Sequence, residues 1–140
     1  MTSGHVTLST HVLDATTGRP AADLHVRLEH RGHEGWSPAC EGLTGADGRL
    51  RLPGPTASPE PSASPEPSAS PEPEPGLAAG PGFEPGVYRI TFGSGPYFAG
   101  RGTASFYPEV TVTFEMTEGG EHYHVPLLLS PFAYSTYRGS

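Results

Sequence analysis

The chain has 140 residues, of which 34% are hydrophobic and 16% charged, and this length and composition allow one domain with a modest core. Its formal net charge is -7 and all eight of its cations are Arg, which excludes a basic surface for nucleic acid, a Schiff-base lysine and a Walker A lysine. A single Cys excludes an internal disulfide and a Cys-based zinc site.

Short segments in which hydrophobic and polar residues alternate make up most of the chain, separated by turns rich in Gly, Pro and Asp. A period of two is typical of strands with one buried face. In chain order, the predicted strands are Leu8–Leu13, Leu24–Glu29, Trp36–Cys40, Arg49–Leu52, Tyr88–Phe92, Val110–Met116, Val125–Leu129 and Phe132–Tyr137. One short helix is expected around Pro96–Gly102. These elements predict an all-β fold, a two-sheet β-sandwich.

Residues 53–82 interrupt this pattern with a low-complexity segment of Pro, Glu, Ser, Ala and Gly. Within it the unit Ala57–Ser62 recurs as Ala63–Ser68 and then decays. Because proline fixes φ and removes a hydrogen-bond donor, neither helix nor sheet is expected here. We interpret the segment as a loop insertion within a single domain of residues 1–140, since loops accept added length at small cost. A ligand for a proline-binding module is the alternative.

The C-terminal stretch differs from the other strands because Val125–Leu129 is apolar at every position. In a two-layer sandwich the outer face of such a strand can be covered only by another subunit, so this stretch predicts an oligomer. Burial by local loops is the alternative. The N-terminal segment has no cationic part followed by an apolar run, and no stretch approaches 18 apolar residues, so we expect a soluble, cytoplasmic protein that does not contact a membrane.

Histidines and one arginine are the candidates for chemistry. His122 and His124 are two apart on a strand and share a face, His11 lies in the middle of the first strand, and Arg49 follows a tight turn. Their spacing leaves three interpretations open: a His-based metal site, hydrolysis in which an imidazole activates water and Arg stabilises an oxyanion, or solvated histidines without chemistry. Cys40 is expected to be a small core residue rather than a nucleophile.

Four segments carry a resemblance to a known family. They are Leu8–Asp14, Gly45–Arg49, His122–Pro131 and Tyr134–Ser140. Together they resemble the 5-hydroxyisourate hydrolases, the enzyme branch of the transthyretin-like family. The resemblance covers the chain outside the proline-rich insertion. Its most specific element is the terminal tetrapeptide, residues 137–140, which separates the hydrolases from the hormone carrier of the same family.

The resemblance implies a transthyretin-like sandwich of about eight strands with one short helix, assembled as a homotetramer with its active sites in a channel between dimers. The implied substrate is a small molecule, 5-hydroxyisourate, whose cyclic amide is hydrolysed to 2-oxo-4-hydroxy-4-carboxy-5-ureidoimidazoline in urate catabolism. Neither a metal nor another cofactor is implied. A transthyretin-type protein that binds a small ligand without catalysis is the alternative.

The resemblance also implies two groups of site residues. The catalytic group is His11, Arg49, His124 and Ser140, and the substrate-binding group is Tyr137, Arg138 and His122. Transthyretin itself carries Lys, Glu and Thr at the positions of His11, Arg49 and His124, and it lacks the terminal tetrapeptide. All of these features place this sequence with the hydrolases.

Overall fold

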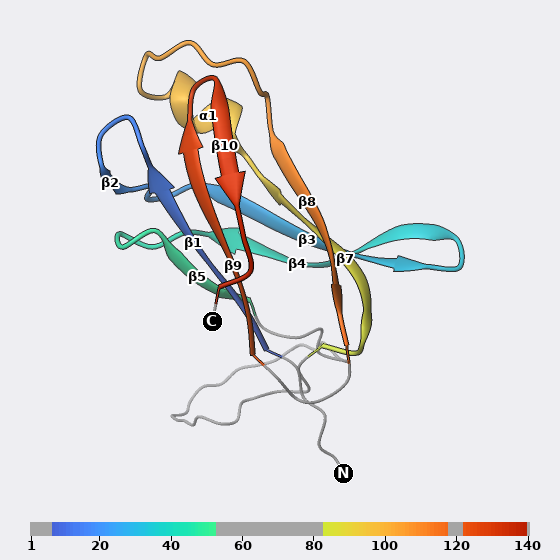
Figure 1. Cartoon of the computed structure of the whole chain (residues 1–140). Helices are drawn as coiled ribbons and strands as arrows, with labels where there is room; N and C mark the ends of the chain where they lie inside the picture. Colours follow the sequence, from blue (N-terminus) through green and yellow to red (C-terminus); the bar gives the residue numbers. More distant parts are fainter. Residues whose placement is uncertain (1–6, 53–82, 118–121, 140) are drawn as a thin grey trace, which may run out of the picture.

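The structure of the protein, a computed structural model, describes residues 7–52, 83–117 and 122–139. The predicted insertion at 53–82 and the candidate Ser140 lie outside the described residues. In the described part the elements are β1 (Thr7–Asp14), β2 (Arg19–Pro20), β3 (His25–Gly32), β4 (Gly35–Leu43), β5 (Arg49–Leu52), β7 (Gly86–Phe92), α1 (Ser94–Ala99), β8 (Val110–Met116), β9 (His122–Ser130) and β10 (Ala133–Thr136) (Figure 1).

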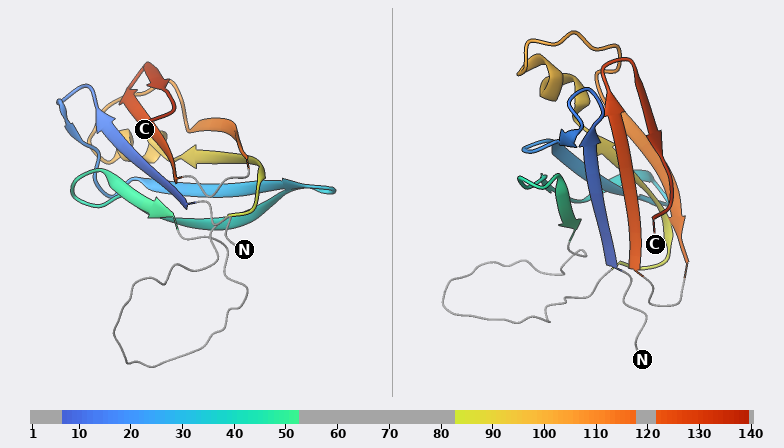
Figure 2. Two further views of the ribbon diagram at one scale, coloured as in Figure 1. Left: turned by 60° about the horizontal axis from the view of Figure 1, so that its bottom comes forward. Right: turned by 60° about the vertical axis from the view of Figure 1, so that its left-hand side comes forward.

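Two sheets face each other, which confirms the predicted sandwich (Figure 2). One sheet has the order β10-β9-β1-β2, and β5 also pairs with β1 on the side of β2. The other has the order β4-β3-β7-β8. Strands β1 and β9 run parallel, and the remaining pairs in the described sheets are antiparallel. As a result, β1 lies between β5 and β9, and segments from the start, middle and end of the chain meet along it.

The core fills the space between the sheets because each strand sends alternate side chains inward. Along β1, Leu8, Thr10 and Val12 are buried while the residues between them are partly exposed, as the sequence pattern predicts. Burying a side chain of this size stabilises the fold by roughly 1.5–3 kcal/mol. The other large, fully buried side chains include Leu28, Phe83, Tyr88, Ile90, Phe92, Phe98, Met116, Leu127 and Leu129.

The helix α1 is present but lies earlier than predicted, at Ser94–Ala99 rather than Pro96–Gly102. Pro96 falls in its first turn, where the missing N–H would have no partner within the helix. Tyr97 on this helix donates a hydrogen bond of 2.9 Å to the Asp14 carboxylate at the end of β1. That carboxylate is buried and also accepts from the backbone N–H of Thr16, so the helix and the end of β1 hold each other in place.

Two further details differ from the sequence prediction or extend it. The pair Arg19–Pro20, which lies outside the predicted strands, forms the short strand β2 against the end of β1. Along β9, Val125, Leu127 and Leu129 are buried, whereas Leu128 is 41% exposed on the opposite face. Among the described residues, no helix is long and apolar enough to cross a membrane.

Candidate active site

The register of three strands brings together three of the four predicted catalytic residues, His11, Arg49 and His124. His11 of β1 lies opposite Arg49 of β5, and Ser9 of β1 lies opposite His124 of β9. The neighbours of these residues along each strand point into the core, so the site residues point outward from one face of the sheet. The structure therefore places both histidines and the arginine on a single surface.

A tight turn delivers Arg49 to this surface. The Asp47 carboxylate accepts a hydrogen bond of 3.0 Å from the backbone N–H of Arg49, and Gly48 has φ of 77°. A Cβ on Gly48 would lie 2.4 Å from the carbonyl oxygen of Val12, so only glycine allows the turn to approach β1 this closely. The Arg49 side chain is 61% exposed, and its contact with Asp47 is long at 3.9 Å, so its charge remains available to a ligand.

Hydroxyl groups link two of the histidines in a continuous chain. The Oγ1 of Thr7 lies 2.5 Å from the Nδ1 of His122, whose Nε2 lies 2.9 Å from the Oγ of Ser9. The same Ser9 oxygen lies 2.8 Å from the Nδ1 of His124. The sequence interpretation missed both hydroxyl residues, although the alternation of β1 already put Thr7 and Ser9 on the face of His11.

The electrostatics of this surface favour neutral imidazoles. Burial lowers the pKa of His124 below its ordinary value, and the electrostatic effects of His122, His11 and the Arg49 guanidinium lower it further. Burial also lowers the pKa of His122, with a smaller contribution from the charge of Arg51. A neutral imidazole can accept a proton from water, so the surface is suited to a base at neutral pH.

The C-terminal tail, residues 137–139, packs directly against His124. The backbone N–H of Gly139 donates a hydrogen bond of 2.8 Å to the His124 carbonyl oxygen. A Cβ on Gly139 would lie 2.6 Å from the Cδ2 of the imidazole ring, closer than real atoms approach. A side chain at this position would force the imidazole ring to move, so glycine lets the tail cross His124 and support one side of its ring.

The two substrate-binding candidates in the tail differ in their placement. The Tyr137 side chain is largely exposed, beside the outward face. The Arg138 guanidinium instead lies over the ring of Tyr123, with Cζ 4.5 Å from the ring centre. Tyr123 is buried between the sheets, so Arg138 lies on the side of the tail away from His11 and Arg49.

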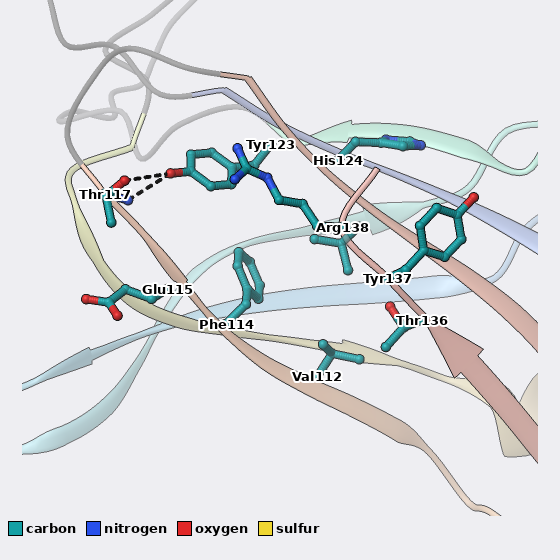
Figure 3. A pocket seen from close by; sticks show the side chains of 10 residues that line it. Val112, Phe114, Glu115, Thr117, Tyr123, His124, Thr136, Tyr137 and Arg138 are labelled. Atoms are coloured by element: carbon teal, nitrogen blue, oxygen red, sulfur yellow. Dashed lines mark hydrogen bonds between the residues drawn. The ribbon is translucent and has the colours of Figure 1, made fainter. Parts of the chain in front are cut away.

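A cavity of about 260 Å³ opens beside Arg138, between β8 and the strands β9 and β10 (Figure 3). Its walls are mainly apolar, and the His124 ring points away from the side chains of Val112 and Phe114 that form its floor. His124 contributes to the lining of the cavity, but its ring is turned toward the histidine surface. The lining residues of the cavity are Val112, Phe114, Glu115, Thr117, Tyr123, His124, Val125, Thr136, Tyr137 and Arg138.

The metal interpretation required a set of ligands on this surface. In the parts of the chain that the structure describes, no group of three or more His, Cys, Asp or Glu residues is arranged to hold a metal ion. Cys40, the alternative nucleophile, is partly buried and packs against the core, and burial raises the pKa of its thiol to about 11. The groups that converge on the outward face are imidazoles, hydroxyls and a guanidinium.

A β-sandwich in which strands from three parts of the chain present these groups belongs to the transthyretin-like class of folds. A model of the HIUase/Transthyretin family matches residues 8–139, and the chain belongs to this family. The resemblance found in the sequence is thereby confirmed.

Individual relatives agree with this assignment. The 5-hydroxyisourate hydrolase of Salmonella dublin is 38% identical over 140 residues, covering 100% of this chain and 85% of that protein. The structure of Klebsiella pneumoniae 5-hydroxyisourate hydrolase matches with a TM-score of 0.66 and 30% identity, covering 96% of this chain and 94% of that one. Sea bream transthyretin in complex with thyroxine matches with a TM-score of 0.71 and 27% identity, covering 94% and 93%. The fold is therefore shared by enzymes and carriers, and the site residues must separate them.

Proposed function

We propose that the chain hydrolyses 5-hydroxyisourate, opening the six-membered ring at its N1–C6 amide bond to give 2-oxo-4-hydroxy-4-carboxy-5-ureidoimidazoline. The observation that carries this proposal is the convergence of His11, His124 and Arg49 on one sheet face, with a lowered pKa at His124. Relatives at 38% and 35% identity that bear the name 5-hydroxyisourate hydrolase support it.

The histidines activate water. An amide carbonyl is a poor electrophile, so water must lose a proton as its oxygen bonds to C6. A neutral imidazole of the pair His11 and His124 takes that proton, and an imidazole returns one to the ring nitrogen when the C–N bond breaks. Water is thereby divided between the new carboxylate and the new N–H, and no redox partner or group carrier is consumed.

Arg49 stabilises the charge that develops on the carbonyl oxygen. Its guanidinium is permanently charged and offers rigidly placed donors. It lies opposite His11 in the β1–β5 pair, so water and oxyanion can be held from neighbouring strands. Loss of one such donor typically costs roughly 10²–10³ in rate.

The tail completes the site in this proposal. Ser140, which lies outside the described residues, orients the substrate or the water. Tyr137 borders the substrate on one side of the histidine surface. His122 acts through its hydrogen-bond chain to His124. The contact of Arg138 with Tyr123 supports a role in holding the tail rather than the reacting ring.

The assembly in this proposal is a homotetramer that acts in the cytoplasm in urate catabolism, without a metal or other cofactor. The outward face of β9 supports an oligomer, because Leu128 is 41% exposed beside the histidine surface and a second copy would cover it. Covering the face would also exclude bulk water from the imidazoles and strengthen the electrostatics of the site.

The insertion at 53–82 is a passive loop of the single domain in this proposal. It falls between β5 and β7 and interrupts no site residue. Deleting residues 57–75 should leave kcat within about twofold of the wild type, since the cost of closing a loop changes slowly with its length. A collapse in turnover with the fold intact would assign the loop an active role.

Ultraviolet absorbance during urate oxidation tests the function directly, because the decay of the 5-hydroxyisourate intermediate can be followed with and without the protein. The proposal predicts faster decay, unchanged by a metal chelator. Decay at the uncatalysed rate, together with tight binding of a small ligand, would favour the transthyretin-type alternative. Activity lost with chelator and restored by metal would favour a metal site.

A further inference from the structure

A row of four polar side chains runs along the β1–β9 pair beside the site. In order they are Thr7, His122, Ser9 and His124, joined by contacts of 2.5, 2.9 and 2.8 Å. The parallel register sets this spacing, because Thr7 lies opposite His122 and Ser9 lies opposite His124. Each imidazole uses a ring nitrogen to contact Ser9, so this one hydroxyl joins the two rings.

We propose that these four side chains form a proton relay that serves the hydrolysis, with Ser9 as the residue that connects His122 to His124. The inference rests on the proposed function, because it assumes that His124 exchanges protons with the attacking water. It assigns a role to Ser9 and Thr7, two hydroxyls whose contacts are otherwise unexplained by the site. It also assigns a role to His122, whose two ring nitrogens both contact hydroxyls of this row.

The direction of the hydrogen bonds follows from what each atom can do. A neutral imidazole carries one N–H, and a hydroxyl donates one hydrogen bond while accepting others. Among the described residues, none forms a hydrogen bond with the Nε2 of His124, so this nitrogen can face water. In the resting state the Nδ1–H of His124 donates to Ser9, the Ser9 hydroxyl donates to His122, and the Nδ1–H of His122 donates to Thr7.

Proton transfer reverses this direction. When the Nε2 of His124 takes a proton from water, its Nδ1 proton passes to the Ser9 oxygen and the Ser9 proton passes to the Nε2 of His122. The Nδ1 proton of His122 then moves to Thr7, whose own proton leaves to solvent at the partly exposed end of the row. His124 ends neutral, with an Nε2–H that can be given to the leaving ring nitrogen, and the return of a proton from solvent resets the row.

The charged groups around the two imidazoles favour passing the proton along the row over keeping it on His124. His11 from β1, Arg49 and Arg51 from β5 and the tail beside Gly139 surround the two imidazoles. The outward-facing residues of β1, β5 and β9 include no carboxylate that could stabilise an imidazolium. Passing the proton along the row keeps His124 uncharged beside the permanent charges of Arg49 and Arg51.

Steady-state kinetics of the full chain with 5-hydroxyisourate test the relay. Ser9→Ala should lower kcat about 10- to 100-fold with KM within about twofold, since positioned proton transfer contributes on the order of 10²–10⁴ in rate. His122→Gln keeps a group that can hydrogen-bond Ser9 but cannot pass a proton from one ring atom to another, so it should lose about as much. The double variant should lose no more than the larger single loss, because both changes break the same row.

Two further variants separate the relay from simple packing. Ser9→Thr retains the hydroxyl and should keep kcat within about threefold of the wild type. Ser37→Ala removes a hydroxyl from β4 in the other sheet and should leave kcat unchanged. A Ser9→Ala enzyme with wild-type kcat, or a His122→Gln enzyme with full activity, would overturn the relay.

Nitrogen-15 NMR of the histidine rings gives a readout that does not depend on turnover. The relay predicts that wild-type His124 carries its proton on Nδ1. In Ser9→Ala the hydroxyl acceptor is lost while the Ser9 backbone still contacts the ring, so the fraction of His124 protonated on Nε2 should rise. A proton on Nε2 in the wild type, or an unchanged fraction in Ser9→Ala, would overturn the relay. A wild-type protein that shows the predicted ring protonation but does not accelerate substrate decay would refute the proposed function instead.

Discussion

The outward faces of the two sheets carry many polar groups, but they arrange them in opposite ways. On the sheet of β3 and β7, two cationic side chains have close acidic partners: the Nε of Arg89 lies 2.6 Å from Glu29, and the Nε2 of His25 lies 2.8 Å from Glu41, while a third cation, Arg27, lies 3.8 Å from Glu29. Arg89 also lies over the ring of Trp36, with Cζ 4.3 Å from its centre. These contacts neutralise the charges locally, which is typical of a surface that stabilises the fold rather than binding a ligand.

The face of β1, β5 and β9 leaves its cations without such partners. Arg49 meets a carboxylate only at 3.9 Å, and His124 contacts a hydroxyl rather than an acid. Cations placed together cost stability, and here they lower the pKa of His124. A surface that accepts this cost is suited to chemistry, whereas the paired surface opposite is suited to stability.

The largest effect expected on the site face comes from removing its two histidines. His11→Ala and His124→Ala should each lower kcat on the order of 10²–10⁴-fold while the fold is retained. The double variant should lose about as much as the worse single variant, because both rings act on one water molecule. Losses that multiply in full would show that the two rings work independently and would contradict a shared water.

The next largest effect is expected for Arg49→Ala, which should lower kcat roughly 10²–10³-fold because the oxyanion would lose its charged donor. Arg49→Lys should recover little, since an ammonium cannot reproduce the planar donors of a guanidinium. Arg31→Ala is the matched control, because Arg31 lies near Trp36 on the paired side of the molecule. Equal activity in the Arg49→Ala and Arg31→Ala enzymes would remove the distinction between the two faces.

The pH dependence of activity and stability tests the comparison of the two faces at one side chain, His124. Because the folded pKa of His124 is lowered, the neutral ring persists to lower pH, and kcat/KM should fall only below the ordinary value near 6.5. Folding favours the neutral ring, so the free energy of unfolding should also fall as pH drops below about 6.5. In an NMR titration Arg49→Ala should raise the pKa of His124. An unchanged or lowered value would contradict the electrostatic account.

The smallest expected effect lies on the paired face. Glu29→Gln should lower the free energy of unfolding by about 1 kcal/mol at pH 7, because the partly exposed contact with Arg89 is lost, and should leave kcat within about twofold. The hydrogen bond from Arg89 lowers the pKa of Glu29, so its contribution is present above the unfolded value near 4.5 and disappears as pH falls through the lower folded value. Thermal unfolding measured from pH 7 down to pH 3 would check this; a difference from the wild type that does not shrink over this range would contradict it.

Strand alternation predicted most of what positions the site. The pattern of β1 alone indicated that His11 points outward, and the spacing of His122 and His124 put both rings on one face. The short helix was also predicted, with its start two residues late, because Ser94 and Gly95 are weak helix formers by themselves. Neither the sheet order nor the pairing of β1 with β5 and β9 could be derived from periodicity, since pairing depends on contacts distant in sequence.

Two features of the site required the structure. Hydroxyl residues are common on strands, so nothing in the sequence distinguished Ser9 as the link between two imidazoles. The resemblance treated the terminal tetrapeptide as one unit, whereas the structure separates its side chains. The exposed Arg138 lies over the ring of the buried Tyr123, and Gly139 supports His124 from the outside. The alternation of side-chain direction along residues 137–139 was the one sequence feature that could have predicted this difference.

One measurement tests the central claim most directly: the turnover of 5-hydroxyisourate by purified His124→Ala and His25→Ala, each assayed at the same concentration as the wild type. The two variants remove the same side chain from opposite faces of the sandwich. We predict that His25→Ala retains wild-type turnover while His124→Ala loses at least about 100-fold. Comparable turnover in both variants would contradict the assignment of the chemistry to the face of β1, β5 and β9.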